Sequence, residues 1–151
     1  MAELRIPELS SETIHASCVS IKGRAVLIEG RSGEGKSDLA LRLIDRGAVL
    51  VADDQTICQR QGVGAAGKLI ASPPLNIAGK IEVRGLGIIE MPHVEKVPVA
   101  LLIVILDAPP RFPEDARKRR IAGVDVPVLA LAALEPSAPI KTELALARMP
   151  E

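Results

Sequence analysis

The chain has 151 residues, of which 48% are hydrophobic, and this length corresponds to a single domain with room for a proper core. It carries 19 basic and 19 acidic residues, one Phe and no Tyr or Trp. This charge balance and the lack of stacking aromatic rings argue against a nucleic-acid-binding protein and against a protein held on membranes by charge. Blocks of Val, Ile, Leu and Ala between Gly and Pro indicate an α/β protein with a central, mainly β-sheet core and few helices.

The two cysteines, Cys18 and Cys58, lie far apart in apolar, strand-like segments without the spacing of a zinc site. We expect free, buried thiols in a reducing compartment. No basic-plus-apolar leader is present, and the longest apolar run, 97–106, contains Pro98 and is too short to span a bilayer. The sequence therefore predicts a cytoplasmic protein.

The chain begins with residues 1–12, which mix charges with Pro7 and two serines and indicate an N-terminal arm. Residues 15–21 alternate as a strand does, and Lys22-Gly23 predicts a tight turn into the next strand. This hairpin would bring His15 beside the loop that follows. Alone, a histidine at a strand start is more often a surface or capping residue than a catalytic one.

A glycine-rich loop follows the second strand. Residues 30–37 read G-R-S-G-E-G-K-S and match the phosphate-binding pattern G-x-x-x-x-G-K-S at every specified position. An apolar run at 25–28 precedes the loop, as expected for a buried parallel strand, and helix formers follow it as far as Gly47. The helix N-terminus would then point at bound phosphates, so the sequence predicts an ATP site.

Each residue type in the loop has a physical purpose. Gly30, Gly33 and Gly35 can adopt positive φ, which lets successive backbone N–H groups turn inward to form an anion nest. Lys36 would reach the β- and γ-phosphates, and the Ser37 hydroxyl would bind the Mg²⁺ that bridges them. The remaining loop residues that we expect at the nucleotide are Arg31, Ser32 and Glu34.

Two acidic strand ends compete for the chemistry. The apolar segment 48–52 ends in Asp53 and Asp54, and carboxylates at this edge of a parallel sheet face the nucleotide crevice. One could hold Mg²⁺ while the other accepts a proton from the attacking hydroxyl. The segment 99–106, followed by Asp107, has the equally good form of a Walker B strand. These patterns alone do not choose between the two strand ends.

The middle of the chain is rich in glycine. Residues 55–71 indicate a hairpin with a flexible turn at 61–67. Residues 81–91 interrupt an apolar run with charges and two glycines and are poor as a plain strand. Close approach of the backbone to a ligand would explain these glycines.

The C-terminal third begins with a charged segment. Residues 111–120 predict a helix that opens after Pro113, with acids in its first turn and bases in its last. A strand is expected at 124–130. A short helix is expected at 138–146, within a C-terminal tail of residues 136–151.

Four segments together resemble the catalytic domain of HPr kinase/phosphorylase. They are His15 ahead of its strand, the loop at 30–37, V-A-D-D at 51–54 and I-E-V-R-G-L-G-I-I at 81–89. The last block is the most specific, because it matches the signature of that family and not phosphate-loop proteins at large. The resemblance covers about residues 13–130, and we place the catalytic domain at 13–135. It implies a P-loop fold of the PEP carboxykinase-like type.

The resemblance implies an enzyme of the bacterial phosphotransferase system. Such an enzyme phosphorylates a serine of the carrier protein HPr with ATP, and it reverses the modification with inorganic phosphate. The resemblance assigns phosphate binding to Lys36, magnesium binding to Ser37 and Glu82, and a place in the catalytic site to His15. It also implies a homo-oligomer, typically a hexamer.

The same resemblance assigns the proton transfer. Asp54 matches the group that accepts a proton in the kinase direction and donates it in the reverse direction, with Asp53 beside it. Asp107 would then be structural. A catalytic arginine of the family fits Arg111 best, with Arg119 and Arg120 as the alternatives.

The chain also departs from the family. Longer members carry a separate N-terminal domain, for which this chain has no room, and a V-P-V-x-x-G-R loop tied to the phosphorylase reaction. Here Val126-Pro127-Val128 is followed by Leu129-Ala130-Leu131, without Gly-Arg. The sequence therefore favours the kinase reaction over the reverse reaction.

Two other functions fit a phosphate-binding loop. A small-molecule kinase would need an acceptor pocket, and the sequence shows no arginine-rich lid to cover one. A non-catalytic ATP-binding sensor is disfavoured because His15, Asp54 and Glu82 occur together. A GTPase would carry an N-K-x-D segment, and the sequence has none.

Overall fold

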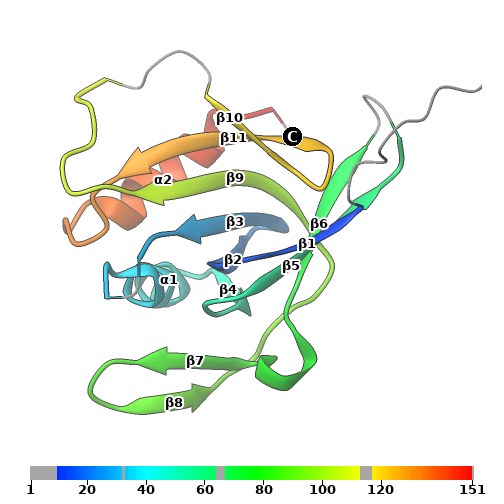
Figure 1. The fold of residues 1–151 in the computed structure, drawn as a ribbon. Coiled ribbons are helices and arrows are strands. Elements are labelled where there is room, and N and C mark those ends of the chain that lie inside the picture. The colour runs from blue at the N-terminus through cyan, green and yellow to red at the C-terminus, as the bar shows by residue number, and fades with distance from the viewer. Residues whose placement is uncertain (1–9, 32, 64–66, 113–116, 151) are drawn as a thin grey trace, which may run out of the picture.

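The computed structural model describes residues 10–31, 33–63, 67–112 and 117–150 (Figure 1). The described residues form strands and two α-helices, which confirms a mainly β-sheet α/β protein. The elements are β1 (Ser11–Ile14), β2 (Ala16–Ile21), β3 (Arg24–Glu29), α1 (Lys36–Asp45), β4 (Val49–Ala52), β5 (Thr56–Gln61), β6 (Lys68–Ser72), a 3₁₀ helix (Leu75–Ile77), β7 (Lys80–Val83), β8 (Gly87–Glu90), β9 (Val97–Ile105), β10 (Lys118–Ile121), β11 (Val124–Leu131) and α2 (Ala138–Ala147).

The centre of the fold is a set of long strands in which β9 lies between β3 and β11, parallel to both. Strand β2 is antiparallel to β3 and to β4, so β4 runs in the same direction as β3. Strands β1, β5 and β6 join this sheet where β6 pairs with the beginning of β9. The predicted hairpins at 15–29 and 55–71 are both present, although residues 64–66 of the second turn lie outside the described residues.

Both faces of the central strands are buried, and alternate residues enter two separate cores. One core places Val26 and Ile28 of β3 against Leu39 and Leu43 of α1. The other core receives the intervening residues of the same strands, such as Leu27, together with residues of β5, β6, β10 and β11. This double burial explains why these strands appear in the sequence as continuous apolar runs.

Helix α1 ends as the sequence predicts. The Gly47 N–H donates to the Ile44 carbonyl and the Ala48 N–H to the Leu43 carbonyl, each at 3.0 Å. Gly47 has φ 113°, so this is a Schellman end with glycine in the left-handed position. The chain is thereby turned directly into β4.

Residues 80–90 form a separate two-stranded hairpin, β7–β8, which stands apart from the main sheet in Figure 1. Its turn contains Gly85 and Gly87, with φ 90° and 93° and open space where a Cβ would lie. The positive φ of the turn therefore accounts for both glycines, and our expectation that these residues would be poor as strands was wrong. Ile81 is buried in the core between the sheet and α1, and it anchors the hairpin.

The helix predicted at 111–120 is also wrong where the structure describes it. Residues 118–121 are strand β10, which pairs antiparallel with β11. Residues 113–116, which include the predicted helix start, lie outside the described residues. The hairpin turns at Ala122 and Gly123, whose φ values are 47° and 80°.

The helix predicted at 138–146 is confirmed as α2, and it packs on the α1 face of the sheet, with Ala138 and Leu146 buried in that core. Of the predicted N-terminal arm, residues 1–9 lie outside the described residues, and β1 begins at Ser11. No helix among the described residues is long and apolar enough to cross a membrane.

Candidate active site

The topology gathers three chain segments at one edge of the sheet. Ala16 at the start of β2 pairs with Glu29 at the end of β3, and Cys18 pairs with Ala52 at the end of β4. Because β2 runs against its two neighbours, its beginning lies beside their carboxyl ends. His15, the glycine-rich loop and the two acids after β4 therefore lie close together.

The loop enters α1 through two glycines in the left-handed region. Gly33 has φ 85°, and Gly35, at the helix N-cap, has φ 100°. Within the loop the Arg31 N–H donates to the Glu34 side chain, and the Glu34 N–H donates to the Arg31 carbonyl at 3.0 Å. Ser32 lies outside the described residues.

Gly30 differs from our expectation, because it is not among the glycines with positive φ. A Cβ added at Gly30 would lie 3.1 Å from Cδ1 of Ile105 in β9. Tight packing between the loop and the side chain of Ile105 therefore favours glycine at this position.

The Asp53 carboxylate is buried at 7% exposure and accepts hydrogen bonds on both oxygens. Its Oδ1 accepts from Ser37 Oγ at 2.6 Å and from Ser17 Oγ at 2.8 Å. Its Oδ2 accepts from the Glu82 N–H at 2.9 Å. Asp53 thus connects β2, the start of α1 and β7, and the donors compensate the burial of its charge.

The Asp54 carboxylate is about half exposed and lies between two basic groups. Its Oδ1 is 3.1 Å from Nζ of Lys36 and 3.3 Å from Nε2 of His15. Lys36 is only 6% exposed, so its ammonium depends on this carboxylate for its charge partner. His15, Lys36 and Asp54 therefore lie together in the structure.

The backbone at Asp54 is unusual. Its φ is 68°, a value that a non-glycine residue seldom adopts. The Gln55 N–H donates to the Asp53 carbonyl at 2.8 Å, which closes a three-residue turn of the rare, strained γ type around Asp54. The Asp54 N–H donates to Ser17 Oγ at 3.1 Å.

Glu82 reaches this region through its backbone N–H, and its side chain is exposed at the end of β7. No group of three or more His, Cys, Asp or Glu side chains that could hold a metal occurs among the described residues. The Ser37 hydroxyl and the Glu82 carboxylate, whose residues both contact Asp53, are oxygen groups that could bind a cation here.

The rival acid, Asp107, is exposed beyond the end of β9. The Ser37 hydroxyl instead donates to Asp53. In phosphate-loop enzymes the loop Ser and an acid at a neighbouring strand end act together on Mg²⁺. The geometry therefore favours the end of β4 over the end of β9.

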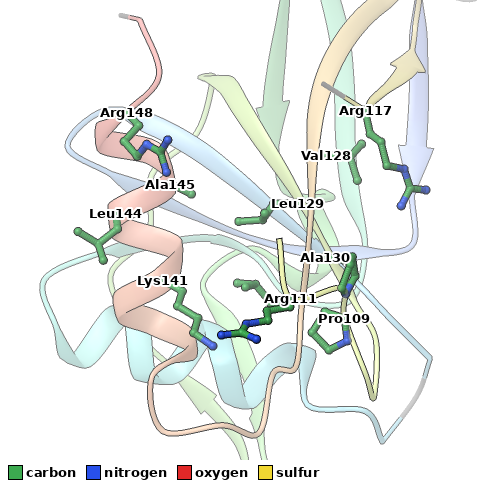
Figure 2. A pocket seen from close by; sticks show the side chains of 12 residues that line it. Pro109, Arg111, Arg117, Val128, Leu129, Ala130, Lys141, Leu144, Ala145 and Arg148 are labelled. Carbon is green, nitrogen blue, oxygen red and sulfur yellow. The ribbon is translucent and has the colours of Figure 1, made fainter. Parts of the chain in front are cut away.

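The three candidate arginines lie in different places. Arg111 is 5.6 Å above the ring of Phe112 and lines a cavity of about 310 Å³ between α2 and β11, where its charged end faces that of Lys141 (Figure 2). Arg119 pairs at 2.7 Å with Glu29, the residue before the loop, and this hydrogen bond raises the pKa of Arg119 above its ordinary value. Arg120 pairs with Asp125 at 3.3 Å. Arg119 thereby contacts the strand that carries the loop.

Sequence reasoning missed Ser17. It is fully buried, and its hydroxyl contacts both acids. The available signal was a serine within the mostly apolar strand β2, but the same strand also contains Ser20, so the residue type alone did not single out Ser17.

Comparison with known proteins gives one consistent family. The model of the HPr Serine kinase C-terminal domain matches residues 8–96. An HPr kinase/phosphorylase of Clostridium tetani is 48% identical over 86 residues, which are 56% of this chain and 27% of that protein. One of Prosthecochloris aestuarii is 33% identical over 132 residues, 80% of this chain and 38% of that protein.

Among solved structures, the Hpr(Ser) kinase/phosphatase of Coxiella burnetii superposes with a TM-score of 0.72 and 32% identity. This match covers 91% of the present chain and 88% of the solved one. The chain spans 27% and 38% of the length of the two curated relatives above.

Proposed function

The chain belongs to the family of the HPr serine kinase C-terminal domain, and from this premise we propose that it transfers the γ-phosphoryl group of ATP to a serine of the carrier protein HPr. The observation that carries the proposal is the cluster at the loop. Asp54 lies within 3.1 Å of Lys36 and 3.3 Å of His15, and Asp53 accepts from Ser37. A base, a phosphate-binding lysine and a hydroxyl suited to Mg²⁺ thus occur side by side.

Nucleotide binding is assigned to the loop and to Lys36. The backbone N–H groups around Gly33 and Gly35 would receive the phosphates at the positive end of α1. Lys36 pairs with Asp54 in this structure, and the phosphate oxygens of ATP would compete for its ammonium. This exchange would leave the Asp54 carboxylate available to the incoming hydroxyl.

Magnesium is assigned to Ser37 and Glu82. The Ser37 hydroxyl donates its one hydrogen to Asp53, so its oxygen lone pairs remain available to a cation. Mg²⁺ usually takes one or two protein ligands beside waters and substrate phosphates, and these residues supply that number. When bound, the ion would neutralise charge on the β- and γ-phosphates.

Asp54 is assigned as the base of the kinase reaction. The serine oxygen of HPr forms a bond to the γ-phosphorus, the bond from that phosphorus to the β–γ bridging oxygen breaks, and ADP leaves. Asp54 takes the hydroxyl proton, and His15, beside it, helps to orient the carboxylate. Phosphoryl transfer needs little covalent work from the protein, so positioning and charge suffice.

Three further features belong to the same proposal. In the reverse direction inorganic phosphate attacks phosphoserine to give pyrophosphate, and Asp54 protonates the departing serine oxygen.

The strand–loop–helix unit at 24–45 supports a P-loop fold of the PEP carboxykinase-like type. A homo-oligomer, with the hexamer as the expected form, also follows from the family.

The test is to incubate the purified chain with Mg-ATP and HPr, measure the intact mass of HPr and map the modified residue. We expect the addition of one phosphoryl group on a serine. Lys36→Ala is the matched control and should leave HPr unmodified, because the phosphates lose their cation. Unmodified HPr with the parent chain, after ATP binding has been confirmed, would contradict the proposal.

A further inference from the structure

A single hydroxyl, that of Ser17, connects the two adjacent acids. It donates to Oδ1 of Asp53 at 2.8 Å and accepts from the N–H of Asp54 at 3.1 Å. A serine hydroxyl has one hydrogen, so donation to Asp53 leaves its lone pairs for the Asp54 N–H. Ser17 is fully buried, so its hydroxyl is shielded from bulk solvent.

The conformation of Asp54 needs such a partner. With φ 68° inside a γ-turn, this peptide segment is strained, and strain of this kind persists only when surrounding contacts hold it. The turn directs the Asp54 carboxylate to Lys36 and His15. The Ser17 oxygen fixes the N–H at the start of that same residue.

The contacts of Ser17 also give the two acids different roles. With Ser17 and Ser37 on one oxygen and the Glu82 N–H on the other, the Asp53 carboxylate is held by donors on both sides. It cannot turn toward Lys36 without losing these hydrogen bonds. Asp54 alone then faces the basic groups.

We propose that Ser17 is a positioning residue, whose hydroxyl holds Asp53 against Ser37 and holds the Asp54 backbone so that only Asp54 presents its carboxylate as the base. This inference rests on the proposed kinase function, which it deepens. Ser17 acts through the acids and touches no substrate.

Ser20 offers a matched control. It is a buried serine of the same strand β2, three residues further on, and it pairs with Ala25 and Val49 at the other end of the strand. Ser17→Ala and Ser20→Ala remove the same atom from the same strand, but only the first removes a contact with the acids.

The experiment measures kcat and the KM for ATP in HPr phosphorylation. We expect Ser17→Ala to lower kcat by roughly 10- to 100-fold, as outer-shell partners of functional groups commonly do, with the KM within about twofold. Ser20→Ala should change neither by more than about twofold. If the substitutions acted only by destabilising strand β2, kcat and KM would change together in both variants. That result, or an unchanged kcat in Ser17→Ala, would overturn the proposal.

A double-mutant cycle separates positioning from general damage. In an Asp54→Asn background the base is already lost, so adding Ser17→Ala should lower the residual rate by a clearly smaller factor than it does in the parent. An equal fractional loss in both backgrounds would overturn the proposal. If Ser17→Ala does not fold, Ser17→Cys replaces it with the same expectation, because a thiol is a weak donor and acceptor.

A nucleotide-free measurement distinguishes this inference from the proposed function. In NMR spectra, Ser17→Ala should shift the Asp54 amide and the carboxyl carbons of both acids, whereas Ser20→Ala should not. If the parent chain fails to phosphorylate HPr, the kinase proposal falls and these shifts decide the positioning. Unshifted resonances would overturn it.

Discussion

Asp53 and Asp54 both follow the end of strand β4, but their environments differ. Asp53 continues from the strand and is buried among donors from three segments. At Asp54 the γ-turn reverses the chain, and the carboxylate emerges half exposed between Lys36 and His15. Adjacent carboxylates are thereby separated into a structural acid and an accessible one.

Two buried thiols should make the protein less stable at alkaline pH. Burial raises the pKa of Cys58 from 9.0 to about 12, and burial also raises the pKa of Cys18 well above its ordinary value. Between about pH 9 and pH 12 the unfolded chain loses protons that the folded chain keeps. Stability is therefore complete below about pH 9 and falls as the pH rises above it.

The variant Cys58→Ala tests this account by urea unfolding at several pH values between 7 and 11. Above pH 9 its unfolding free energy should fall less steeply than that of the parent, by up to about 1.4 kcal/mol per pH unit. At pH 7 the two should differ only by the constant cost of the smaller side chain. Parallel pH profiles would contradict the assignment to Cys58.

Among the elements, helix α2 is part of the core. Leu146 is 2% exposed and packs into the α1 cluster, whereas Leu144, on the same helix, is 59% exposed. Arg46 of α1 and Glu143 of α2 form an ion pair at 2.7 Å between the two helices. Exposed pairs of this kind add little stability, so the buried leucine should hold the helix.

Leu146→Ala should therefore destabilise the protein by about 2–5 kcal/mol, through lost burial and a cavity. Leu144→Ala, the same substitution on the same helix, should cost no more than about 0.5 kcal/mol. Urea unfolding with a shared m-value measures both. Equal effects would mean that residues 136–151 behave as a tail outside the cooperative unit.

Local sequence patterns correctly predicted the elements that tertiary pairing does not override. Strand β3 appears in the sequence as an apolar run, and helix α1 appears as a segment of helix formers that ends at a glycine. Both elements lie where the sequence predicts them. Residues 118–121 carry a helix-like charge pattern, but pairing with β11 and the turn at Ala122 and Gly123 override it. Helix propensity is a weak preference that tertiary pairing readily reverses.

At the scale of the whole molecule, the sheet order decides which acid meets the loop. Strands β4 and β9 both run in the direction of β3, so Asp54 and Asp107 both follow carboxyl ends of strands, as the sequence suggested. The sequence could not choose between them, because strand order depends on contacts between distant segments. The role of Ser17 was inaccessible for the same reason, since its partners lie 36 and 37 residues away.

The most direct test that Asp54 is the base of the kinase reaction is single-turnover phosphorylation of HPr by two variants, Asp54→Asn and Asp107→Asn. The affinity of each variant for ATP is measured in parallel. Asp54→Asn should lower the rate by about 10²- to 10⁴-fold, the usual contribution of a general base, with ATP affinity largely kept. Asp107→Asn should stay within about twofold of the parent. A parent-like rate in Asp54→Asn, with the loss in Asp107→Asn instead, would contradict the account and move the chemistry to the end of β9.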